Sequence, residues 1–226
     1  MNVNNPFALY KWQALFDARD IFIDGLTTTL EVAIGALILS ILLGIIFGIA
    51  GVFPNKIIRA INRVYVEFFQ NTPLVIQVIF IYNALPHLHI ILPVLLIGII
   101  GVGIYTGAYM AEAVRGGIMA VPKGQLEAAL SQGFNYWQVM WYIILPQSKK
   151  VMLPAMANQA INLVKNTSVL AMIAGGDLMY QADSWSGTNM YYGPAYIVTG
   201  LCYWIIWTSV ISFVLRSMLT NEGVIS

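Results

Sequence analysis

The chain has 226 residues, of which 59% are hydrophobic and 9% are charged, and its formal net charge is +1 at neutral pH. A soluble domain carries about 25% charged residues, so a soluble fold of this length would expose a large apolar surface to water. The small net charge also argues against a nucleic-acid-binding surface. The composition therefore predicts an integral membrane protein.

Residues 1–24 precede the first long apolar run and have an amphipathic pattern. Trp12, Leu15 and Phe16 stand at helical spacing between polar residues. This pattern favours a short helix lying on the outer membrane surface.

Residues 25–220 are expected to form the transmembrane domain. Crossing about 30 Å of hydrocarbon takes roughly 20 residues in a helix. Five largely uncharged runs come close to that length: residues 33–52, 68–85, 90–111, 151–176 and 196–215. The sequence thus predicts an all-α membrane protein with five transmembrane helices and a short tail at residues 221–226.

The basic residues indicate how this domain is oriented. Eight Lys and Arg residues fall on one side of the predicted spans: Lys56, Arg59, Arg63, Arg115, Lys123, Lys149, Lys150 and Arg216. The opposite side has only Lys11 and Arg19. Since cytoplasmic loops are enriched in Lys and Arg, we expect the N-terminus outside, the C-terminus in the cytoplasm and a cytoplasmic loop at about residues 116–150.

Glycine pairs in the first and third predicted spans favour close helix packing. Gly44 and Gly48 are four residues apart, as are Gly103 and Gly107. Small residues at this spacing let two backbones approach closely, either within one chain or at a subunit interface.

The cytoplasmic loop is predicted to form two short helices. Pro122 suits the first position of a helix that ends near Gly133, with Glu127 expected in its first turn. Asn135 followed by Gln138 predicts a capping box at the start of a second helix, which would run to Pro146.

The adjacent residues Ala128 and Ala129 leave the first of these helices with little side-chain bulk. Either another protein surface approaches it closely, or the helix rests on lipid headgroups. The residues alone leave both interpretations open.

The same loop resembles a known motif. Glu127-Ala128-Ala129, three residues, Gly133, nine residues, Ile143, one residue and Leu145-Pro146 match the EAA loop of binding-protein-dependent ABC importer permeases. The stretches "GAYMAEAVRGGIMAVPKGQLEAA", "LPAMANQAINLVKNTSV" and "FFQNTPLVIQ" resemble the polar amino acid permeases of that family.

This resemblance implies a type I ABC importer permease fold in a bacterial cytoplasmic (inner) membrane. It also implies that Glu127, Ala128, Ala129 and Gly133 belong to a coupling helix that docks on a cytoplasmic ATPase dimer. The further partners it implies are a second permease subunit, identical or paralogous, and an extracytoplasmic amino-acid-binding protein.

The chain itself is not expected to be an enzyme. It contains no GxxxxGK[ST] phosphate-binding loop, so ATP and Mg²⁺ would bind to the partner ATPase. We expect no cofactor and no metal on this chain, and we place His87 and His89 in an outer loop. Glu112 and Arg115 are expected to pair with each other or to brace the coupling loop.

Polar residues in the fourth predicted span are candidates for the substrate pathway: Gln159, Asn162, Lys165, Asn166 and Thr167. Unpaired polar groups in hydrocarbon are costly, so those present usually face a cavity or a partner. Lys165 would either pair with Glu31 or Glu67 or attract a substrate carboxylate.

The carboxamides at residues 159, 162 and 166 share one helix face and both donate and accept hydrogen bonds. They favour glutamine, then glutamate or aspartate, as the substrate. Related permeases often have Asp where this chain has Asn166, which makes a cationic substrate less suitable. The alternative function is a secondary amino acid transporter driven by an ion gradient; its usual two-fold repeat of broken helices does not fit five spans and one long loop.

Overall fold

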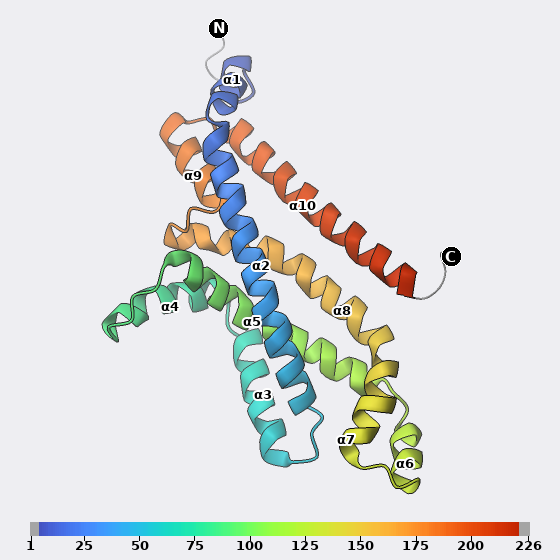
Figure 1. The fold of residues 1–226 in the computed structure, drawn as a ribbon. Helices are drawn as coiled ribbons and strands as arrows, with labels where there is room; N and C mark the ends of the chain where they lie inside the picture. Colours follow the sequence, from blue (N-terminus) through green and yellow to red (C-terminus); the bar gives the residue numbers. More distant parts are fainter. Residues whose placement is uncertain (1–4, 222–226) are drawn as a thin grey trace. The chain divides into compact units, whose positions relative to one another are not determined.

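The computed structural model describes residues 5–221, and every element in this range is helical (Figure 1). The elements are α1 (Leu9–Asp17), α2 (Arg19–Ala50), α3 (Lys56–Gln70), α4 (Leu74–His87), α5 (Val94–Met119), α6 (Lys123–Ser131), α7 (Tyr136–Val139), the π-helix η1 (Met140–Ile144), α8 (Leu145–Asn166), the 3-10 helix η2 (Thr167–Ile173), α9 (Leu178–Asn189) and α10 (Tyr192–Asn221). The predicted all-α class is confirmed.

The helices form two compact units. One contains the chain up to Leu37, Leu74–Gly103 and the residues from Ile161 on, and the other contains Ile38–Pro73 and Ile104–Ala160. The long helices α2, α5 and α8 each contribute to both units.

The first unit is built around the N-terminal half of α2. Val32 and Ala36 are fully buried there and belong to one apolar cluster with Leu163 and Leu170. The start of α9 is held against the same half of α2, because the backbone N–H of Leu178 donates to the hydroxyl oxygen of Thr29 over 3.0 Å.

Asp177 is the N-cap residue of α9 in this unit. One oxygen of its carboxylate accepts a hydrogen bond from the backbone N–H of Met179 at 3.1 Å, as expected of an N-cap residue. The residue is fully buried, and its Oδ1 has no partner among the residues that the structure describes.

The second unit is held together where the C-terminal half of α2 meets α5 and α3. A side chain added at Gly44 would place its Cβ 2.5 Å from the Cβ of Met110, and at Gly48 it would lie 2.5 Å from the Cβ of Val114. The glycine pair therefore allows close packing of α2 on α5 within the chain. Tyr65 of α3 donates from its hydroxyl to the carbonyl of Ile104 over 2.8 Å.

Some of the predicted spans correspond to a single long helix, and others are divided between two helical elements. Among the described residues, α2 and α5 are each long and apolar enough to cross a membrane. The second predicted span, residues 68–85, is not one helix: α3 ends at Gln70 and α4 begins at Leu74. Pro73 explains the break, since proline lacks an N–H and keeps the preceding residue out of the helical region.

The fourth predicted span also differs from a single α-helix. Its residues divide between α8 and η2, with the change at Asn166. The fifth lies within α10. The tail at residues 222–226 falls outside the described residues.

Candidate coupling helix and translocation pathway

The expected coupling helix is α6, and its C-terminal end has the predicted form. The backbone N–H of Phe134 donates to the carbonyl of Ala129 at 3.2 Å, and that of Gly133 donates to the carbonyl of Leu130 at 3.0 Å. This pair of bonds is a Schellman motif, which needs a residue with positive φ after the helix. Gly133 supplies it with φ of +89°.

The N-terminal end differs from the prediction by one residue. Pro122 is the N-cap rather than the first helical residue, and the helix begins at Lys123. The expectation that Glu127 lies in the first turn is therefore wrong; it lies in the second, and its side chain is exposed.

The two alanines of the motif have different surroundings. Ala129 is 4% exposed and packs in an apolar cluster with Val114, Val139 and Met140. Ala128 and Glu127 are exposed. Ala129 thus attaches α6 to the rest of its unit, and Ala128 lies on the outer face of the helix.

The second loop helix begins as predicted. Asn135 accepts from the N–H of Gln138 at 2.9 Å, and the Gln138 side chain accepts from the N–H of Asn135 at 2.8 Å, which together form a capping box. Tyr136 donates to the carbonyl of Val52 over 3.3 Å, and partial burial raises the pKa of its hydroxyl. Figure 1 shows α7 beside α6, and both belong to the same unit.

The expectation that this helix ends at Pro146 is wrong. A π-helix at Met140–Ile144 joins α7 to α8, and Pro146 is the second residue of α8. Pro146 stands just after the wider π-helical turn, where its missing N–H and its ring disturb the hydrogen-bond ladder least.

The candidate pathway residues occupy the C-terminal part of α8 and the start of η2. Asn162 and Lys165 are exposed, and Gln159 and Asn166 are half-buried. Within the part of the chain that the structure describes, the side chains of the three carboxamides make no hydrogen bond to protein. They are available to a ligand or a partner subunit.

For two of the candidate pathway residues, Lys165 and Thr167, the structure shows which polar groups their side chains do and do not pair with. Lys165 forms no ion pair with any residue between 5 and 221. Glu67, one of its two predicted partners, pairs with Arg63, whose Nε lies 3.8 Å from Glu67 Oε1. Thr167 is fully buried, and its hydroxyl donates to the carbonyl of Val164 over 2.7 Å.

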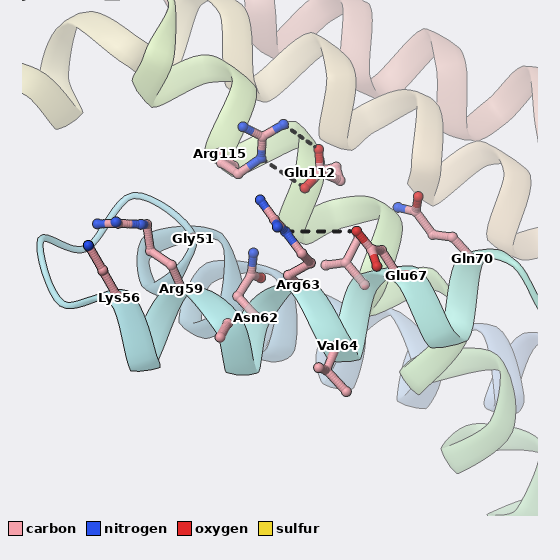
Figure 2. Close-up of a pocket in the computed structure, with 12 residues that line it drawn as sticks. Gly51, Lys56, Arg59, Asn62, Arg63, Val64, Glu67, Gln70, Glu112 and Arg115 are labelled. Carbon is pink, nitrogen blue, oxygen red and sulfur yellow. Dashed lines mark hydrogen bonds and ion pairs between the residues drawn. The ribbon is translucent and has the colours of Figure 1, made fainter.

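A pocket beside α3 was not predicted. Figure 2 shows that basic residues of α3 and the Glu112–Arg115 pair of α5 line it. Arg115 donates to both oxygens of Glu112, at 2.9 and 2.7 Å, so the expected pairing of these two residues is confirmed. The available sequence signal for the pocket was the three- and four-residue spacing of Lys56, Arg59 and Arg63 along α3.

The chain is similar to known permeases over most of its length. Residues 40–217 match the family model described as binding-protein-dependent transport system inner membrane component. The chain is 41% identical over 192 residues to a probable glutamine ABC transporter permease of Bacillus subtilis, covering 85% of this chain and 89% of that protein. It is 32% identical over 211 residues to the glutamine transport system permease of Escherichia coli K12, covering 92% and 96%.

Solved structures show the same fold. An amino acid ABC transporter crystallised with histidines superposes with a TM-score of 0.83 at 30% identity, covering 92% of this chain and 97% of that one. The inward-facing methionine transporter MetNI gives a TM-score of 0.71 at 14% identity, covering 89% and 98%, which concerns the fold alone. With its apolar helices, the family indicates a bacterial cytoplasmic membrane protein. The chain belongs to the binding-protein-dependent inner membrane component family and is a non-catalytic permease subunit of a polar amino acid ABC importer.

Proposed function

We propose that the chain forms part of the translocation pathway for glutamine or a similar polar amino acid and transmits ATP-driven movement through α6. In this proposal five segments cross the membrane, with the N-terminus outside and the C-terminus in the cytoplasm. The partners are a cytoplasmic ATPase dimer, a second permease subunit and an extracytoplasmic binding protein. ATP and Mg²⁺ bind only to the ATPase.

The geometry of α6 is the observation that supports coupling. Ala129 is buried against its own unit, and neighbouring Glu127 and Ala128 are exposed on the outer face. A helix that is attached on one side through Ala129 and presents the small side chain of Ala128 on the other suits insertion into a groove of a partner protein. Glu127 adds a charge at the edge of that surface.

Ala128→Trp tests this role without disturbing the turn at Gly133. A bulky residue at Gly133 would also strain its positive φ, so a loss of function there would not separate docking from folding. We expect Ala128→Trp to reach the membrane, to retain fewer ATPase subunits on purification and to lose ATP-dependent uptake in proteoliposomes.

The matched control is Ile38→Trp, which adds the same side chain at a position of α2 that is 58% exposed. It should keep ATPase subunits and uptake. Wild-type ATPase retention and uptake by Ala128→Trp would refute the docking role. Uptake by the intact complex that needs an ion gradient and no ATP would favour the secondary transporter.

The α8 carboxamides and the relatives' substrates support the choice of glutamine. The Bacillus subtilis and Escherichia coli permeases are named for glutamine. The amides of Gln159, Asn162 and Asn166 can donate to and accept from a carboxamide substrate, and Lys165 adds positive potential that opposes a cationic one.

The test is competition for radiolabelled glutamine uptake by the complete transporter. We expect strong competition by unlabelled glutamine, weaker competition by glutamate or aspartate, and least by arginine, lysine or histidine. Histidine is the most informative competitor, because the similar solved amino acid transporter was crystallised with histidines. Stronger competition by histidine or arginine than by glutamine would refute the proposed order.

A further inference from the structure

A pocket of about 610 Å³ lies on one face of α3 within its own unit. Lys56, Arg59 and Arg63 of α3 line it together with Arg115 of α5 (Figure 2). The three α3 residues are spaced by three and four positions, which brings their side chains to the same helix face. The pocket therefore concentrates four cationic groups.

Nearby carboxylates balance only part of this charge. Both carboxylate oxygens of Glu112 accept hydrogen bonds from Arg115, and Glu67 Oε1 lies 3.8 Å from Arg63 Nε. These are the two acidic residues that line the pocket. Four cations and two carboxylates leave an excess of two positive charges.

The other two basic residues, Arg59 and Lys56, differ in whether protein groups bind their side chains. Arg59 donates to the carbonyls of Phe53 and Pro54 at 2.7 and 2.8 Å, which holds its guanidinium in place. Lys56 makes no ion pair with any residue in the described range, and its side chain is exposed. The ammonium group of Lys56 is available to an anion.

A buried amide adds a second, independent sign of a ligand. Asn62 lines the pocket and is only 5% exposed, yet its Oδ1 has no hydrogen-bond partner among the described residues. Buried polar atoms are normally paired. A ligand with a hydroxyl or ammonium donor next to its anionic group would complete this site.

The opposite face of α3 is apolar and open. Ile57, Ile61 and Phe68 are between 58% and 71% exposed. A helix that combines a basic face with exposed large apolar side chains suits the boundary between headgroups and acyl chains. A free phosphate ion would use the basic residues alone, whereas a phospholipid would use both faces.

We propose that the pocket binds the phosphodiester headgroup of an anionic phospholipid, in the cytoplasmic leaflet under the orientation proposed above. The basic side chains contact the phosphate oxygens through charge-assisted hydrogen bonds. The hydroxyl groups of a glycerol headgroup supply the donor that Asn62 lacks. Basic pockets between membrane helices on the cytoplasmic side suit this chemistry.

Native mass spectrometry of the full chain in detergent, titrated with phosphatidylglycerol, tests the proposal. Lys56→Gln combined with Arg63→Gln removes two exposed cations from the pocket. The matched control, Lys149→Gln combined with Lys150→Gln, removes two exposed cations from α8. We expect the pocket variant to weaken binding roughly 30-fold and the control to leave it unchanged, since each basic residue near an anionic surface changes affinity about five-fold.

Lys56→Glu alone provides a second variant that breaks no protein ion pair, and circular dichroism verifies that each variant is folded. Equal loss of phosphatidylglycerol from pocket and control variants would overturn the proposal. Equal retention of phosphatidylcholine by the wild-type chain would overturn it as well. Displacement of the lipid by millimolar inorganic phosphate would assign the pocket to a soluble anion instead.

Discussion

Replacing Gly48 by alanine should measurably loosen the packing of α2 on α5. The new Cβ would lie 2.5 Å from the Cβ of Val114, 2.6 Å from its Cγ1 and 2.8 Å from the carbonyl oxygen of Ala111. Carbon atoms pack best at about 3.5–4.0 Å, so the helices must separate by roughly 1 Å. Neither a Cβ nor a backbone oxygen is able to move aside by changing rotamer.

Overpacking of this kind costs about 1–3 kcal/mol. Alanine also gains up to about 1 kcal/mol over glycine inside a helix. Gly116→Ala receives the same gain on α5 but has no atom within 4 Å of its added Cβ, so it is the matched control. We therefore expect the two variants to differ by about 1–3 kcal/mol, or roughly 5- to 150-fold in the folding equilibrium constant.

The assay is reversible unfolding of the detergent-solubilised chain by increasing sodium dodecyl sulfate, followed by circular dichroism. Gly48→Ala should unfold at a lower mole fraction of dodecyl sulfate than Gly116→Ala. If both variants unfold together, or Gly48→Ala is the more stable, then the close approach of these two helices does not contribute to stability as argued.

Three further predictions concern α6, α9 and the orientation of the chain. Gly133→Ala should destabilise the turn after α6 by about 1 kcal/mol, because φ is +89° there, whereas Gly124→Ala in the same helix should not; thermal unfolding compares them, and equal midpoints would contradict the argument. Burial raises the pKa of the Asp177 carboxyl from 3.8 to about 6, so the folded state binds its proton more tightly than the unfolded chain does, and stability should fall as the pH rises from about 4 through about 6. Asp177→Asn retains a capping side chain and should lack this pH dependence in the same unfolding assay; an unchanged dependence would assign it to another group. In a Cys202→Ser background, Lys149→Cys should be labelled by an impermeant thiol reagent only from the cytoplasmic side and Ser184→Cys only from outside, and labelling of Lys149→Cys in intact cells would reverse the topology.

Local signals along the chain were enough to predict the class of the protein and several helix ends. Gly133 ends α6 because the turn needs a positive φ that glycine adopts at little cost, and Asn135 starts α7 because its side chain accepts the N–H of Gln138. These outcomes depend on a few neighbouring residues. The membrane class follows in the same way from composition alone.

The tertiary structure decided what depends on residues far apart in the sequence. Ala128 and Ala129 are adjacent residues of the same type, so the sequence does not distinguish them. The packing of α6 on Val114 and Met140 buries Ala129 and leaves Ala128 exposed. The pocket required α5 to bring Arg115 to the basic face of α3, more than fifty positions away in the chain. Spacing within one helix predicts which side chains share a face, but the element packed against that face is set by contacts that no local pattern specifies.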